Sequence, residues 1–243
     1  MDTLIEYLRD LAKAIPLETS FDWEMPAGLP IDIPADVEGA FSQNVYLKEN
    51  LAPLLEQDHE LTIHYWIIRE WGGIRSFQVG DRNNQRIRTF KKEVQRGRLT
   101  RDTFGAISSL SKLSSFWEPE KYAIYDSRAI FSLNWLIFRH CKYKQLFLQP
   151  PSRGAIIKYD TQTLFRLSKT DHEYRPYRTA FHDYCALLQN LSEQIYNNQR
   201  PYYVEMLLFL AAPNYIIADI ENSVAVTISD KGRNPVAQLQ DRF

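Results

Sequence analysis

Apolar residues recur at three- and four-residue steps along most of this 243-residue chain, and this spacing predicts a mostly α-helical fold. Residues 15–35 interrupt the pattern with four prolines and are predicted to form an extended loop, while 224–228 is the only strand-like run. Helices are predicted over residues 2–14, 36–55, 61–71, 82–101, 102–116, 126–140, 176–197 and 201–212.

Several classes of protein are excluded by composition. The two cysteines are too few for a disulfide scaffold or a Cys-rich zinc module. The apolar run 202–210 is half the length of about 20 residues that a membrane span needs, so it is expected in the core. The first 16 residues are acidic and amphipathic, unlike a secretory signal. These features predict a cytoplasmic protein that does not bind membranes.

Charge is divided unevenly along the chain. Residues 1–60 hold 13 acidic and 3 basic side chains, whereas the remainder holds 17 acidic and 26 basic ones. We therefore expect an acidic N-terminal segment, residues 1–59, that packs on a helical domain of residues 60–243, unless the two form one continuous domain. The acidic segment is the expected docking site for any protein partner.

Residues 82–101 form a strongly basic helix in this prediction. Ile87, Phe90 and Val94 define one buried face, and Glu93 is the only acidic residue in the run. A solvated basic face is the ordinary explanation, but this excess also suits binding to nucleic-acid phosphates. The predicted phosphate-binding residues are Arg82, Arg86, Arg88, Lys91, Lys92, Arg96, Arg98 and Arg101.

The stretch 102–135 carries a recognisable motif. A predicted helix contains Lys112, a loop follows, and Asp126 opens the next helix 14 residues later. The motif is similar to that of the helix–hairpin–helix DNA glycosylases, and closest to the 8-oxoguanine glycosylase branch and its uncharacterised relatives. The matching residues are Ser111, Lys112, Leu113, Phe116, Pro119, Tyr122, Ile124, Asp126, Ser127 and Arg128.

The resemblance implies a glycosylase-like helical fold that binds DNA and recognises or removes a nucleobase. It makes Lys112 the nucleophile that forms a Schiff base with the sugar and Asp126 the assisting carboxylate. This chemistry needs no metal and no organic cofactor. Arg128 joins the predicted DNA contacts. The aromatic residues expected to line a pocket for the extruded base are Trp71, Phe116, Trp117, Tyr122 and Tyr125.

A second hypothesis keeps the fold without turnover. The residues aligned with the family's glycine-rich hairpin, 107–111, contain no glycine. The chain would then be a binding subunit of a larger assembly, such as one for defence. Lys112 would be a surface lysine of an amphipathic helix, and Asp126 would be a helix cap. A nuclease or toxin-type effector is a third alternative, but no carboxylate cluster has metal-binding spacing.

Four further features have structural interpretations. His64 lies within an apolar helix, where a core or pocket-edge role is expected. The segment 182–185 contains a histidine and a cysteine but lacks a second ligand pair for zinc. Trp71, Gly72 and Gly73 form either a tight turn or a point of close approach to a ligand. Glu205, inside an apolar run, is expected to face solvent or pair with an arginine.

Overall fold

The computed structural model describes residues 1–150 and 159–225, and it is mostly helical, as predicted. The α-helices are α1 (Asp2–Ala14), α2 (Leu17–Ser20), α3 (Ala40–Asn50), α4 (Ala52–Gln57), α5 (Thr62–Trp66), α6 (Asp81–Gln95), α7 (Arg101–Gly105), α8 (Ile107–Trp117), α9 (Ser127–His140), α10 (Thr161–Leu167), α11 (Tyr177–Tyr196), α12 (Pro201–Ala211) and α13 (Ile217–Ser223). Two π-helical turns, η1 (Ile67–Trp71) and η2 (Ala212–Ile216), follow α5 and α12. Strands β1 (Gln145–Leu146) and β2 (Glu173–Tyr174) pair in parallel, with Gln145 opposite Glu173.

Some predicted helices are divided in the structure. The segment 36–55 forms α3 and α4, because Pro53 lacks the N–H that a continuous helix would use. The segment 102–116 forms α7 and α8, which meet at Ala106. The predicted loop 15–35 contains the short helix α2. In the strand-like run 224–228, residues 224 and 225 are not in a strand, and the remainder lies outside the described residues.

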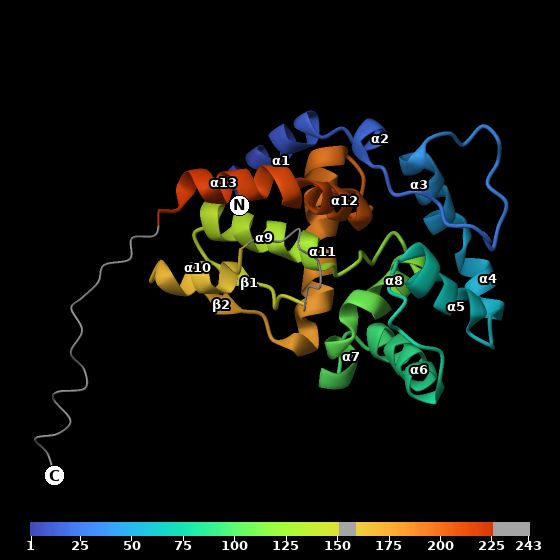
Figure 1. The fold of residues 1–243 in the computed structure, drawn as a ribbon. Helices are drawn as coiled ribbons and strands as arrows, with labels where there is room; N and C mark the ends of the chain where they lie inside the picture. Colours follow the sequence, from blue (N-terminus) through green and yellow to red (C-terminus); the bar gives the residue numbers. More distant parts are fainter. Residues whose placement is uncertain (151–158, 226–243) are drawn as a thin grey trace, which may run out of the picture.

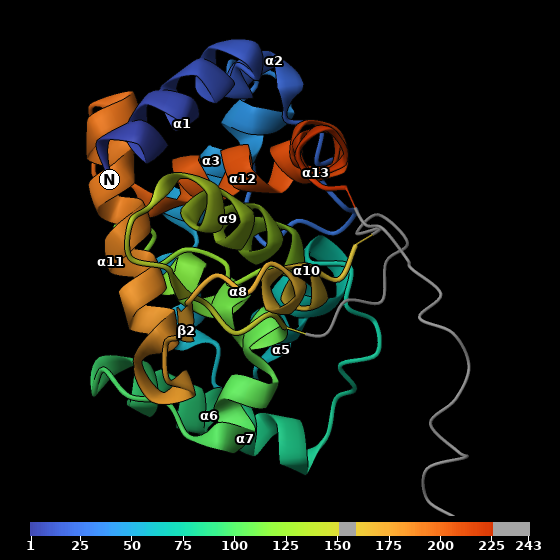
Figure 2. The same ribbon diagram turned by 90° about the vertical axis from the view of Figure 1, so that its left-hand side faces the viewer.

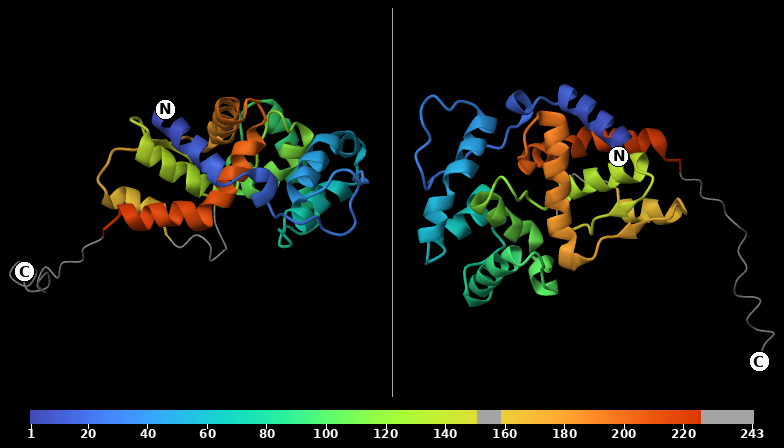
Figure 3. Two further views of the ribbon diagram at one scale, coloured as in Figure 1. Left: turned by 90° about the horizontal axis from the view of Figure 1, so that it is seen from above. Right: turned by 180° about the vertical axis from the view of Figure 1, so that it is seen from behind.

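The helices divide into two halves around a central pair (Figure 1). Helices α3 to α8 lie on one side, and α1, α9, α10 and α13 lie on the other, with α11 and α12 between them. Helix α12 packs against α11 and α9, while α1 rests on α9 and α11. The views from the side, above and behind give the same arrangement (Figures 2 and 3). The chain passes from one half to the other in the loop between α8 and α9.

Helix α6 buries the face that its apolar spacing predicts. Ile87, Phe90 and Val94 are buried against the core, and the cationic side chains point outward or lie at the edge. Buried Glu93 accepts a hydrogen bond from the backbone N–H of Thr100 at 2.9 Å. The carboxylate therefore fixes the chain where it leaves α6 and enters α7.

The run Pro201–Ser223 has the length and hydropathy of a membrane span. However, 56% of its most apolar stretch is buried within the protein, and core helices of soluble proteins share these properties. The predicted core position of 202–210 agrees with the burial of most of α12.

Helix α9 is fixed to the chain that follows it by a reciprocal pair of hydrogen bonds. Asn134 donates to the carbonyl oxygen of Phe147 at 2.8 Å and accepts from the Phe147 N–H at 2.7 Å. Ser132 on the same helix donates to the Leu208 carbonyl of α12 at 2.8 Å. The Asn134 side chain thus satisfies the Phe147 backbone groups, which lie outside any helix or strand, as buried polar groups require.

We expect Asn134→Ala to lower the free energy of unfolding by about 2–4 kcal/mol, because it leaves a buried N–H and a buried carbonyl of Phe147 unpaired. Urea denaturation followed by circular dichroism measures this change. The control is Asn50→Ala, which removes an exposed amide and should cost much less. Equal stability of the two variants would contradict the anchoring role.

Candidate functional site

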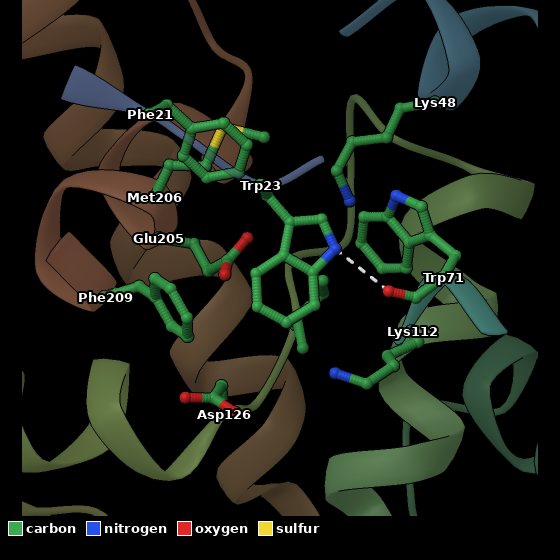
Figure 4. A pocket seen from close by; sticks show the side chains of 10 residues that line it. Phe21, Trp23, Lys48, Trp71, Lys112, Asp126, Glu205, Met206 and Phe209 are labelled. Carbon is green, nitrogen blue, oxygen red and sulfur yellow. Dashed lines mark hydrogen bonds between the residues drawn. The ribbon is translucent and has the colours of Figure 1, made fainter. Parts of the chain in front are cut away.

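A narrow pocket with a free volume of about 40 Å³, open to solvent, lies where the two halves meet. This volume is well below the range of about 300–1,000 Å³ usual for small-ligand sites, so a ligand of that size needs a lining side chain to move. Helices α3, α8 and α12, the turn η1 and the segment after α2 all contribute side chains (Figure 4). The lining residues are Phe21, Trp23, Lys48, Trp71, Lys112, Ile124, Asp126, Glu205, Met206 and Phe209. Lys112 and Asp126, singled out in the sequence, therefore face the same pocket.

Asp126 reaches the pocket as the N-cap of α9. Its backbone is extended, and its Oδ1 accepts the N–H of Arg128 at 2.7 Å, which satisfies one free donor of the helix. The carboxylate is half-buried and lines the pocket opposite the Lys112 amine (Figure 4). Capping thus holds the carboxylate in place while it faces the pocket.

Lys112 lies on α8 and is only 7% exposed. Burial lowers the pKa of its amine, while Asp126 and Glu205 act in the opposite direction. Lys112 forms no ion pair among the described residues. The surface-lysine interpretation of Lys112 is therefore wrong. An amine with a lowered pKa is more often neutral near pH 7, and only the neutral form can attack carbon.

The turn before α6 makes room for the Lys112 side chain. In η1 the N–H of Gly72 donates to the carbonyl of Ile67, five residues back, at 2.8 Å. A Cβ atom at Gly72 would overlap Cδ of Lys112 and lie 2.7 Å from its Cε. The close approach expected at this glycine pair is therefore an approach to the lysine stem. Such π turns often occur at functional sites.

Lys48 is a second buried amine in the pocket, and the sequence analysis missed it. Its Nζ donates to Ser115 Oγ at 3.0 Å and lies 4.7 Å from the centre of the Phe116 ring. Burial lowers its pKa to about 8, with Lys112 lowering it further and Glu205 raising it. Lys48 shares the apolar stripe of α3 with Phe41, and a lysine in such a stripe is the signal that could have identified it.

Glu205 lies on α12 and is 5% exposed. The expectation that it faces solvent is therefore wrong, and among residues 1–150 and 159–225 no arginine pairs with it. Its Oε2 has no hydrogen-bond partner among the described residues. Burial raises the pKa of this carboxyl to about 7, against the opposing effect of Lys48.

Two tryptophans and an asparagine form a hydrogen-bonded wall. The indole N–H of Trp23 donates to the Trp71 carbonyl at 2.9 Å, and the indole N–H of Trp71 donates to Asn44 Oδ1 at 2.9 Å. The Asn44 amide completes the link by donating to the Trp23 carbonyl at 2.8 Å. This network holds the N-terminal segment against the pocket, as Figure 4 shows for Trp23.

Of the five aromatic residues expected to line the pocket, only Trp71 does so. Phe116 lies behind Trp71, with ring centres 4.8 Å apart. Trp117 packs against Phe90, where Lys91 covers it. The remaining two pack against α11: Tyr122 stacks on Phe181, and Tyr125 meets Tyr184 edge to face. The physical reason is that the loop between α8 and α9 turns these rings into the core.

Two of the predicted phosphate-binding side chains have partners within the protein, and the others are exposed. Arg86 is half-buried and pairs with Asp102 at 2.7 Å, and Arg128 places its guanidinium 4.5 Å from the Phe209 ring centre beside the pocket. The exposed members on and after α6 are Arg82, Arg88, Lys91, Lys92, Arg96, Arg98 and Arg101.

The histidines singled out in the sequence have structural partners. His64 is buried, and its Nδ1 lies 2.7 Å from Asp58, a carboxylate that also caps the start of α5. His182 Nε2 lies 3.0 Å from the carbonyl oxygen of Val94. Within residues 1–150 and 159–225, no group of three or more His, Cys, Asp or Glu side chains is placed to hold a metal ion.

Comparisons of the chain with protein-family models, with curated proteins and with solved structures find no match. The function must therefore be argued from the pocket.

The raised pKa of Glu205 predicts a pH-dependent stability. The carboxyl titrates near 4.5 in the unfolded chain and near 7 when folded, so folding takes up a proton between these values. The contribution of Glu205 to the free energy of unfolding should therefore fall as pH rises from about 4.5 to about 7. Glu205→Gln removes this effect. The difference in the free energy of unfolding between the variant and the wild type should therefore shift in favour of the variant by about 1–3 kcal/mol across the same pH window.

Urea denaturation at half-unit pH steps measures the difference. Glu193→Gln, which replaces an exposed glutamate on α11, should follow the wild-type profile. Parallel profiles for Glu205→Gln and the wild type would show that this carboxyl titrates normally.

Proposed function

We propose that the chain binds DNA and acts on a nucleotide turned out of the stack into the pocket, as a base-excision glycosylase of the helix–hairpin–helix kind. The observation that carries the proposal is the pocket itself, where the Lys112 amine and the Asp126 carboxylate open onto one space with aromatic walls. These are the two residues that the glycosylase-like motif singles out in the sequence.

In the proposed reaction the neutral Lys112 amine attacks the anomeric carbon of the sugar. The bond between the sugar and the base breaks, and its electron pair leaves with the base, which takes up a proton. The new amine–sugar adduct loses a proton and opens to a Schiff base. Asp126 stabilises the positive charge that develops on the sugar as the base departs.

The surroundings of Lys112 support a nucleophilic role. Burial lowers the pKa of its amine, and this direction favours the neutral form that can attack carbon. The carboxylates of Asp126 and Glu205 oppose this lowering of the pKa. They are also placed to accept the proton that the amine loses on bond formation. The lowered pKa of Lys112 is the direction that a nucleophilic amine requires.

The position of the basic helix supports DNA as the substrate. Helix α6 packs against α7 and α8, and α8 carries Lys112. The exposed cations after Ile87 thus belong to the half of the protein that supplies the nucleophile.

The second candidate is a non-catalytic subunit that binds DNA or another protein through the same fold. The observation that favours it is the ring of Trp23, which lies in the middle of the pocket and narrows it (Figure 4). In this alternative, a partner of the acidic N-terminal segment would move Trp23, or the pocket would never take a base. The protein is proposed to act in the cytoplasm in either case.

The proposal predicts a covalent adduct with a duplex that contains an abasic site, trapped by borohydride and seen as a shifted band on a denaturing gel. Lys112→Gln should abolish the adduct. Asp126→Asn should slow its formation at least tenfold while the protein stays folded, because asparagine is also a good helix cap. Exposed Lys121→Gln should behave as the wild type.

Lys48→Gln separates the two buried amines. If the adduct survives in Lys112→Gln and is lost in Lys48→Gln, the nucleophile is Lys48 and the proposed role of Lys112 is wrong. Absence of an adduct in folded wild type on abasic and damaged-base duplexes would favour the non-catalytic candidate.

The contact between Gly72 and Lys112 gives a separate prediction. Gly72→Ala should slow Schiff-base trapping at least tenfold, because the added methyl group displaces the lysine stem. Gly80→Ala, where a Cβ meets nothing within 4 Å, is the matched control. Thermal melts should show that both variants fold. If Gly72→Ala trapped the adduct at the wild-type rate, displacement of the Lys112 side chain would have no effect on the reaction, and the prediction would be wrong.

A further inference from the structure

The ring of Trp23 fills most of the pocket. It stands in the middle of the space (Figure 4), with its centre 6.3 Å from the Trp71 ring and 5.9 Å from the Phe209 ring. The free volume that remains, about 40 Å³, has room for about three water molecules, because each needs about 10–15 Å³. A sugar or a base therefore enters the pocket only when Trp23 leaves it.

Trp23 belongs to a long connection that has no helix or strand of its own. Residues 21–39, which we call the strap, join α2 to α3 (Figure 1). Loops longer than about 12–15 residues without regular structure are uncommon in compact domains and are usually functional, for example as lids. Phe21 is the only fully buried residue of the strap. The strap thus lies mostly on the surface, with one aromatic side chain turned into the pocket.

Two short hydrogen bonds of Trp23 fix the strap to the core. The indole N–H donates to the Trp71 carbonyl at 2.9 Å, and the Trp23 carbonyl accepts from the Asn44 amide at 2.8 Å. The other described side-chain hydrogen bonds that join the strap to α3 and α5 are longer, at 3.4 Å and 3.5 Å. Withdrawal of Trp23 from the pocket therefore breaks the main anchor of the whole segment.

The strap carries charge of one sign only. No lysine or arginine lies between Lys13 and Lys48. Within residues 1–150 and 159–225, no carboxylate of the strap forms an ion pair with a cation. A phosphate backbone beside the pocket repels these charges, and this repulsion favours the detached strap. The acidic residues, all exposed, are Asp22, Glu24, Asp32, Asp36 and Glu38.

We propose that the strap is autoinhibitory: Trp23 plugs the pocket in the free protein, and the phosphates of bound DNA displace the strap so that the sugar reaches Lys112. This inference rests on the proposed function and adds its regulation. A ligand that binds only the open form shifts the balance between open and closed molecules toward the open form. In the absence of DNA, the plug keeps the Lys112 amine away from small carbonyl compounds that would react with it.

Cleavage by a glutamate-specific protease after Glu24 measures the position of the strap, because this bond reaches a protease only when the adjacent Trp23 leaves the pocket. The ligand is a duplex with a tetrahydrofuran abasic analogue, which cannot form a Schiff base. In the wild type, saturating duplex should speed cleavage after Glu24 at least fivefold, while cleavage after exposed Glu60, outside the strap, should change less than twofold. Trp23→Ala should be cleaved fast without DNA, and Leu29→Ala, at an exposed strap position, should behave as the wild type.

Neutralised strap charges test the trigger while the plug stays in place. A triple variant, Asp22→Asn with Asp32→Asn and Asp36→Asn, keeps Glu24 as the cleavage site, and saturating duplex should give at most half of the wild-type stimulation. The control neutralises three exposed carboxylates of α1 and should keep the full stimulation: Asp2→Asn with Glu6→Gln and Asp10→Asn. Full stimulation in the strap variant would overturn displacement by phosphate repulsion.

Borohydride trapping on an abasic duplex measures the consequence for the reaction. Trp23→Ala should form the adduct at least fivefold faster than the wild type, because the space no longer has to be vacated. A Trp23 that served only as a wall of the site would give a slower variant. Unchanged or slower trapping in folded Trp23→Ala, or protection of Glu24 by bound DNA, would overturn the proposal.

The protease and the trapping assays together separate the strap from the reaction. Exposure of Glu24 on DNA binding without any adduct would support the strap and remove the excision chemistry. Adduct formation without exposure of Glu24, and without a gain in Trp23→Ala, would support the chemistry and remove the strap. A wild type that does not bind the duplex at all, as judged by fluorescence anisotropy, would overturn both.

Discussion

Removal of charged side chains from water is the constraint on which the pocket depends. Lys48, Lys112 and Glu205 are almost fully buried, and an isolated buried charge costs several kcal/mol. Glu205 reduces this cost by attracting both amines, which repel each other, and burial brings the pKa values of all three groups toward neutrality. The same desolvation that lowers stability therefore favours the neutral form of the amines and gives Glu205 a carboxyl group that can exchange a proton near pH 7.

These charges come together only through the tertiary fold. The two lysines lie on α3 and α8 in one half, Glu205 lies on the central helix α12, and Asp126 lies at the start of α9 in the other half. The π turn η1 ends at Gly72, which provides space for the lysine stem. A small shift between the halves would separate the amines from the carboxylates, so packing across the centre of the fold sets the chemistry of the site.

The sequence predicted what depends on local pattern. Helical spacing located most helices and the buried face of α6, and the motif placed Lys112 and Asp126 on successive helices that meet at one pocket. It could not predict which aromatic rings line the pocket, because Tyr122 and Tyr125 turn into the core through contacts with α11. Partners far apart in the chain decide such orientations. Lys48 and Glu205 interrupted apolar stripes, but only the fold shows that they share a cavity.

The N-terminal segment belongs to the site as well as to the surface. It supplies Phe21, Trp23 and Lys48 to the pocket, so an acidic extension that only packs on the outside does not describe it. Exposed Asp22 and Glu24 flank Trp23, and like charge would repel a phosphate backbone from that side. The exposed cations of α6 lie on the half that carries Lys112. The distribution of charge therefore directs the proposed polyanion to approach over α6 and α8, with the acidic segment closing the opposite side of the pocket.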